Sequence, residues 1–111
     1  MSENPPILIL VRDLMFASRI AATARAENAP IKAIKDPAQL GGEPGTRLIV
    51  DLNQAGAIEA AAHWKTTHGG EVIGFVSHVD TATIERAKAA GIDRVLPRSQ
   101  FVQELAELLR N

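Results

Sequence analysis

Short apolar runs recur along the chain, and polar residues or Gly and Pro separate them. Every residue of the run at 7–11 is Ile, Leu or Val, which is typical of a strand buried on both faces of a sheet. The later runs also contain β-branched residues and also end at polar or turn-forming residues. The pattern predicts five strands, at residues 7–11, 31–34, 47–52, 71–77 and 92–96.

Between and after these runs, apolar residues recur at the spacing of an amphipathic helix. Asp13, Asp80 and Ser99 are predicted N-caps, because a side-chain oxygen at that position can accept hydrogen bonds from free N–H groups of the first turn. Gly91 is predicted to end one of the helices. The spacing predicts helices over residues 14–28, 55–67, 81–90 and 99–110.

One connection is too rich in helix-breaking residues to hold a full helix. Residues 36–45 include five Gly or Pro residues among ten, so at most one helical turn fits near their start. We therefore expect a shortened second helix between the second and third strands.

The alternation of strands and helices predicts an α/β fold: a doubly wound, five-stranded parallel sheet with helices on both faces. A chain of 111 residues is expected to form a single domain over residues 1–111, with a core over about 7–109. In such sheets, binding sites lie at the carboxyl ends of the strands, where the strand order reverses. The residues that follow the first, third, fourth and fifth strands are therefore the candidates for function.

Composition and charge exclude several classes of function. The net charge is −1 and the chain has no cysteine, which argues against binding to nucleic acid or to a membrane surface and excludes thiol catalysis. The run at 7–11 is too short for a signal-peptide core or a membrane span, so we expect a cytoplasmic protein. No phosphate-binding loop, dinucleotide fingerprint or nucleophile elbow is present.

Three segments, in order along the chain, resemble the receiver domain of two-component response regulators. Residues 47–53 (RLIVDLN) resemble its third strand, which ends in the aspartate that accepts a phosphoryl group. Residues 72–77 (VIGFVS) resemble the fourth strand, which ends in a Ser or Thr switch residue. Residues 89–98 (AAGIDRVLPR) are similar to the stretch that leads through the fifth strand to the lysine of the family. The resemblance implies a flavodoxin-like fold.

The resemblance also implies roles for four residues. Asp51 would be the phosphoacceptor, Ser77 would contact the phosphoryl group, and Arg98 would replace the lysine. The backbone carbonyl of Asn53 would be a metal ligand. Since the planar guanidinium of arginine is not equivalent to an ammonium group, the replacement at Arg98 departs from the family pattern.

A larger departure lies after the first strand, where receivers carry a pair of acids that bind magnesium. Val11 and Arg12 stand at these two positions, and Asp13 follows. A site made of Asp13, Asp51 and the Asn53 carbonyl has fewer charged ligands, so it is expected to bind magnesium weakly, with no other cofactor. Arg12 could instead pair with Asp51 and supply positive charge. We therefore expect a degenerate receiver, or pseudo-receiver.

The expected function is that of a stand-alone receiver-like signalling module that is not an enzyme. It would act by contact with a protein partner, such as a histidine kinase or an output protein, and a homodimer is compatible with this role. Two alternatives stay open. One is a phosphorylatable single-domain response regulator with Asp51 as phosphoacceptor. The other is an anti-sigma-factor antagonist-like domain, although the residues after the third predicted strand, Gln54 to Ala57, lack the Ser or Thr which that function needs.

Overall fold

All five predicted strands form one parallel sheet in the computed structural model of the chain, which describes residues 5–77 and 80–110. The order across the sheet is β2-β1-β3-β4-β5, and every neighbouring pair is parallel. The chain therefore moves to one side of β1 first and to the other side afterwards, as predicted for a doubly wound sheet. The strands are β1 (Ile7–Leu10), β2 (Ile31–Ala33), β3 (Arg47–Asp51), β4 (Glu71–Val76) and β5 (Arg94–Pro97).

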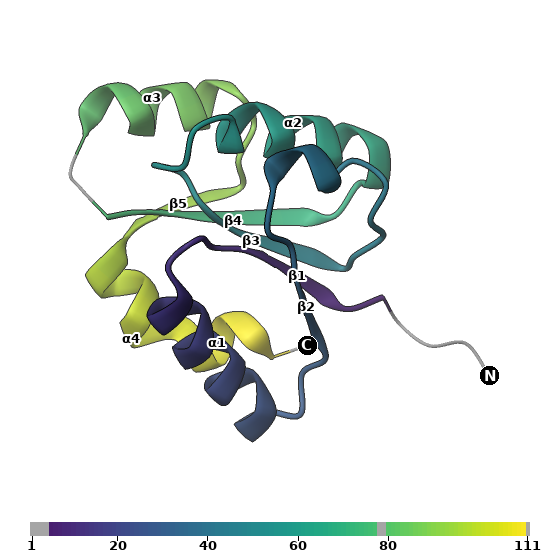
Figure 1. Cartoon of the computed structure of the whole chain (residues 1–111). Coiled ribbons are helices and arrows are strands. Elements are labelled where there is room, and N and C mark those ends of the chain that lie inside the picture. The colour runs from purple at the N-terminus through teal and green to yellow at the C-terminus, as the bar shows by residue number, and fades with distance from the viewer. Residues whose placement is uncertain (1–4, 78–79, 111) are drawn as a thin grey trace.

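Helices cover both faces of the sheet, as Figure 1 shows. On one face lie α1 (Leu14–Ala26) and α4 (Arg98–Leu109), which contact each other. On the other face lie α2 (Ala57–His68) and α3 (Thr81–Ala89), with the single 3₁₀ turn η1 (Pro37–Gln39) beside α2. The shortened second helix is thus confirmed as one turn. None of the described helices combines the length and the apolar character that crossing a bilayer requires.

The two faces of the sheet bury separate apolar cores. Between the sheet and α1 and α4, the rings of Phe16, Phe75 and Phe101 pack together, with centroids 4.8 to 5.8 Å apart. On the opposite face, Trp64 of α2 is fully buried and its indole N–H donates to the carbonyl of Glu43 at 2.8 Å. That hydrogen bond attaches the Gly- and Pro-rich connection to α2, so the connection is ordered without a full helix.

Helix ends follow local signals at most positions. Asp13 and Asp80 cap α1 and α3 through their side-chain oxygens, as predicted. Asn28 has a φ of 56°, so α1 ends at Ala26 and stops short of the predicted residue 28. Gly91 has a φ of 91°, and the N–H of Ile92 donates to the carbonyl of Ala87. This closure uses the first residues of the predicted fifth strand, which is why β5 begins later.

The predicted cap of the last helix is wrong. Pro97 occupies the N-cap position with extended backbone angles, and α4 begins at Arg98 without a side-chain cap. Ser99 therefore lies inside the first turn. The reason is that β5 runs directly into α4 with no connecting loop, and proline has a fixed φ suited to the position before a helix.

Candidate functional site

The carboxyl ends of β1 and β3 lie side by side at the point where the strand order reverses. Leu10 of β1 pairs with Val50 of β3, so residues 11–13 and Asp51 emerge at the same edge of the sheet. Asp51 is the last residue of β3 and is partly buried, and it pairs with Phe75 of β4. This edge is where a site is expected in a doubly wound sheet.

Asp51, Asn53 and Ser77 are connected through a chain of hydrogen bonds. One carboxylate oxygen of Asp51 accepts the backbone N–H of Asn53 at 3.0 Å. The side-chain oxygen of Asn53 accepts the backbone N–H of Ser77 at 2.7 Å. Three residues predicted for one site are therefore neighbours in the fold. Asn53 contributes a side chain that joins the ends of β3 and β4, beyond the backbone carbonyl that the resemblance assigns to it.

A second pair of predicted residues, Asp13 and Arg98, also meets. The guanidinium of Arg98 lies 3.5 Å from a carboxylate oxygen of Asp13, and its central carbon lies 4.0 Å from the centroid of the Phe16 ring. A cation above an aromatic face is attracted by the electron density of the ring. Arg98 is the first residue of α4, an unfavourable place for a positive charge, and Asp13 and Phe16 compensate for it.

Asp13 has a second set of contacts. Its other carboxylate oxygen accepts the backbone N–H groups of Met15 and Phe16, at 3.0 and 3.2 Å. The hydrogen bond from Phe16 has the largest effect and lowers the pKa of the Asp13 carboxyl, and partial burial opposes it; the hydrogen bond from Met15 and the charge of Arg98 lower the pKa further, so the net shift is downward. The Asp13 carboxylate is therefore held in its ionised form by the start of α1 and by Arg98.

Val11 and Arg12, which stand at the two positions where the receiver pattern has acids, supply no carboxylate for a metal ion. Val11 is 8% exposed and belongs to the core beneath α1. Arg12 is exposed and lines a groove together with Leu14 and Lys35. Arg12 is not a member of any ion pair found between residues 5–77 and 80–110, and its pairing with Asp51 stays a prediction.

The donor set does not fit the magnesium site that the resemblance implies. Of the three predicted ligands, Asp13 already binds two backbone N–H groups and Arg98. That leaves one carboxylate, Asp51, and the carbonyl of Asn53, whereas hard divalent cations require several oxygen ligands and favour negative charge. Within the described residues, no group of three His, Asp or Glu side chains is placed to hold a metal ion.

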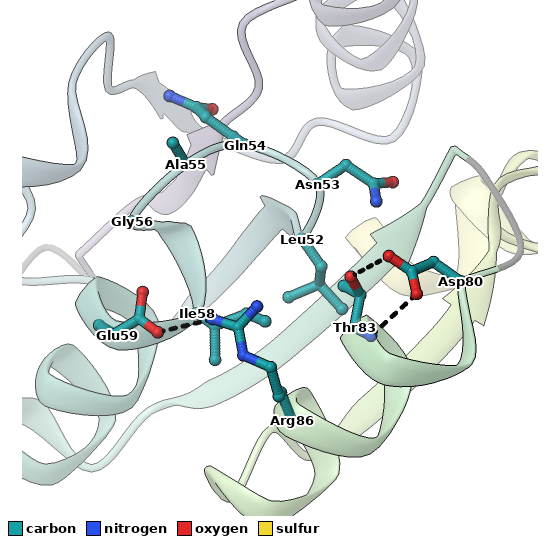
Figure 2. Close-up of a pocket in the computed structure, with 10 residues that line it drawn as sticks. All are labelled: Leu52, Asn53, Gln54, Ala55, Gly56, Ile58, Glu59, Asp80, Thr83 and Arg86. Carbon is teal, nitrogen blue, oxygen red and sulfur yellow. Dashed lines mark hydrogen bonds and ion pairs between the residues drawn. The ribbon is translucent and has the colours of Figure 1, made fainter.

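A polar pocket of about 210 Å³ opens beside this edge, between the loop after β3 and the start of α3 (Figure 2). Asp80 accepts the hydroxyl of Thr83 at 2.7 Å, and Arg86 pairs with Glu59 at 2.9 Å. The hydrogen bond from Thr83 is the main cause that lowers the pKa of Asp80. The Arg86–Glu59 pair connects α3 to α2, whereas the contact of Asp80 with Thr83 closes the start of α3.

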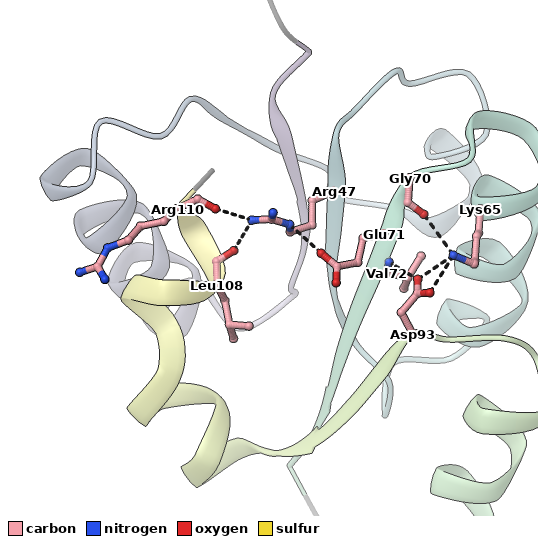
Figure 3. Close-up of polar contacts among 8 residues, drawn as sticks. All are labelled: Arg47, Lys65, Gly70, Glu71, Val72, Asp93, Leu108 and Arg110. Atoms are coloured by element: carbon pink, nitrogen blue, oxygen red, sulfur yellow. Dashed lines mark hydrogen bonds and ion pairs between the residues drawn. The ribbon is translucent and has the colours of Figure 1, made fainter.

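The opposite edge of the sheet carries charged contacts of a structural kind, as Figure 3 shows. Arg47 and Glu71, the first residues of β3 and β4, form an ion pair at 3.0 Å. Lys65 of α2 pairs with Asp93 at 2.7 Å, and Asp93 also accepts the N–H of Val72. These contacts lie at the amino ends of the strands, away from the candidate site.

The sequence analysis did not identify two residues that shape the site. Phe16 provides the aromatic face beneath Arg98, which lies 82 residues later in the sequence and is therefore not revealed by local spacing. Thr83 stands three residues after Asp80, within reach of the cap, and its hydroxyl donates to the Asp80 carboxylate.

No family model and no curated protein matches the sequence. Solved structures do match its fold. A response regulator from Burkholderia pseudomallei, crystallised with a phosphorylated aspartic acid, a calcium ion and citrate, has a TM-score of 0.79 at 16% identity, covering 97% of this chain and 68% of that one. The phosphorylated cyanobacterial phytochrome response regulator RcpA has a TM-score of 0.79 at 12% identity, covering 96% and 91%.

A CheY-like receiver domain protein from Methanospirillum hungatei has a TM-score of 0.78 at 14% identity, covering 96% of this chain and 94% of that one. Identities this low describe a shared fold and carry no residue roles. The chain therefore has the fold of response regulator receiver domains, which confirms the predicted fold class.

Proposed function

We propose that this chain, with its receiver fold, is a signalling module that acts by protein–protein contact and does not depend on magnesium-dependent phosphorylation of Asp51. The observation that carries the proposal is the state of Asp13. It is the first acid after β1, and its carboxylate accepts hydrogen bonds from the start of α1 and pairs with Arg98. With Val11 and Arg12 at the expected acidic positions, the site has too few negative ligands for a hard cation.

Arg98 supports the same conclusion. In the receiver pattern a lysine at this position supplies a positive charge near the phosphoryl group. Here the guanidinium faces Asp13 and lies on Phe16, which gives it two partners other than Asp51. We infer that the site keeps one arrangement without a metal and that it is not the centre of an enzyme.

The alternative, a phosphorylatable response regulator, is favoured by one observation. Asp51 ends β3 beside Ser77, and Asn53 connects the two residues. This arrangement places a carboxylate and a hydroxyl-bearing residue at neighbouring strand ends. An anti-sigma-factor antagonist is less favoured, since the solved structures named above are response regulators or receivers.

The two hypotheses are separated by phosphoryl labelling. We expect that acetyl phosphate with magnesium leaves the mass of the protein unchanged in intact-mass spectrometry, and that calorimetric titration detects no saturable magnesium binding. Labelling would require an Asp51 oxygen to attack the phosphorus atom while acetate departs. A magnesium-dependent gain of one phosphoryl group that Asp51→Asn abolishes would refute the proposal and support the alternative.

A second variant tests whether the missing acids after β1 are the reason for weak magnesium binding. Arg12→Asp restores one carboxylate at an exposed position, so the fold is expected to remain intact while the affinity for magnesium rises. Arg25→Asp is the matched control, because Arg25 is also exposed but lies in the last turn of α1. If neither variant gains affinity, the missing acids are not what limits metal binding. If both gain equally, the effect is one of net charge.

A further inference from the structure

An apolar groove lies between the start of α1 and the end of β2, outside the site around Asp51. Its volume is about 420 Å³, and Val11, Leu14, Ala17 and Ile34 line it. Val11 and Ile34 are 8% and 4% exposed, whereas Leu14 is 81% exposed. The groove therefore combines deep apolar positions with a large apolar side chain that faces solvent.

Exposed apolar area is concentrated at this place. Leu14 and Met15 are the large hydrophobic side chains that the described part of the chain leaves exposed, and they are adjacent in the first turn of α1. Single exposed apolar residues are ordinary on protein surfaces. Two adjacent exposed apolar residues beside an apolar groove mark a candidate binding surface, because covering them with a partner would remove apolar area from water and lower the free energy.

Positive charge flanks the groove. Arg12 and Lys35 both line it, and neither forms an ion pair with a residue in the described ranges. The acids next to them in sequence are engaged elsewhere. Asp13 binds the start of α1 and Arg98, and Asp36 accepts the N–H of Ala38 at 2.9 Å. A partner with carboxylates would therefore complement charges that the protein itself does not neutralise.

We propose that this groove binds an acidic peptide segment of a partner protein, which inserts an apolar side chain against Leu14 and Ile34 while its carboxylates face Arg12 and Lys35. The shape favours a peptide over a membrane surface, because a flat bilayer cannot reach the buried Val11 and Ile34. The inference rests on the proposed action by protein contact, and it adds a surface and a partner chemistry.

The probe is a synthetic amphipathic peptide of about twelve residues made of Leu and Glu, titrated into ¹⁵N-labelled protein. We expect amide shifts centred on Arg12, Leu14, Ala33 and Lys35. The double variant Arg12→Glu/Lys35→Glu is expected to weaken binding by about tenfold or more, because it replaces attraction by repulsion. Leu14→Ser is expected to weaken binding by a similar factor without loss of helix content in circular dichroism, since Leu14 is already exposed.

Arg25→Glu/Lys88→Glu is the matched control: it makes the same change in net charge at two exposed residues that do not line the groove. It should leave the affinity within about twofold. The proposal is overturned if no peptide binding is detected, if the amide shifts lie elsewhere, or if a Leu/Lys peptide binds equally well. Saturable binding to phosphatidylglycerol vesicles that needs Arg12 and Lys35, without peptide binding, would identify a membrane site instead.

These readouts involve no phosphoryl transfer. Labelling of Asp51 would refute the proposed function and leave the groove intact. Absence of peptide binding would refute the proposed role of the groove and would leave the proposal that Asp51 is not phosphorylated unaffected.

Discussion

Gly74 occupies a position in β4 where an added Cβ atom would clash with a neighbouring side chain. It pairs with Val50 and Val95 in the middle of the sheet, and a Cβ atom placed on it would lie 2.6 Å from the side chain of Leu52. Leu52 directly follows Asp51 and is 3% exposed. The glycine thus leaves room for the residue that packs the end of β3, next to the candidate site.

Gly74→Ala is expected to lower the free energy of unfolding by about 1 to 3 kcal/mol, because the added methyl group overpacks the core. Leu52→Ala alone should cost about 2 to 5 kcal/mol through the cavity that it creates. In the double variant the methyl group fills part of that cavity, so its cost should be clearly below the sum. Urea denaturation measures all three variants, and strictly additive costs would contradict the contact.

At the scale of elements, Arg47 attaches the end of α4 to the start of β3. Its guanidinium donates to the carbonyls of Leu108 and Arg110, at 2.5 and 3.0 Å, and pairs with Glu71. These carbonyls belong to the last turn of a helix, where backbone acceptors lack partners and negative partial charge accumulates. The carbonyl contacts should therefore contribute more to stability than the half-exposed ion pair.

Arg47→Met is expected to destabilise the protein by about 2 to 3 kcal/mol, because it removes hydrogen bonds from a charged donor. Glu71→Gln removes only the charge of the partner and should cost less than about 1 kcal/mol. Urea denaturation compares the variants, and hydrogen exchange of the last turn of α4 locates the effect. Equal costs for both variants would show that the ion pair, and not the carbonyl contact, is what matters.

For the molecule as a whole, several carboxyl groups make the free energy of unfolding depend on pH. Burial raises the pKa of Asp93, but hydrogen bonds from Lys65 and from the N–H of Val72 outweigh it and lower that pKa below 3.8. Hydrogen bonds from Gln100 and Arg94 lower the pKa of Glu104 below 4.5. The pKa values of Asp13 and Asp80 are lowered as well. All four groups bind protons more weakly in the folded chain than in the unfolded chain.

The free energy of unfolding should therefore be nearly constant above about pH 5.5 and fall as the pH drops through 4.5 and 3.8, where the unfolded chain takes up protons first. Asp93→Asn should lower stability near neutral pH and flatten the decline in acid, because one of the responsible groups is gone. Glu85→Gln is the control, since Glu85 is exposed and forms no ion pair within the described ranges. Urea midpoints measured across this pH range provide the comparison. An unchanged slope in Asp93→Asn would contradict the assignment.

Local chemistry was enough to predict the elements. Apolar runs identified the strands, and Asp13 and Asp80 identified two helix starts, because a strand buried on both faces and a helix cap each depend on adjacent residues. Gly and Pro in the segment after β2 predicted its single helical turn. The prediction of Ser99 as an N-cap was wrong because the backbone of the nearby Pro97 determined where α4 begins.

The sequence by itself thus determined the fold class and brought Asp51, Asn53 and Ser77 to neighbouring strand ends, because parallel strands in register carry such residues together. Only the tertiary structure decided the partners of the charged groups. Arg98 lies far from Asp13 in sequence and meets it because α4 packs beside α1. A guanidinium can reach several neighbours, and the packing of helices selects among them, so no local pattern could reveal this pair.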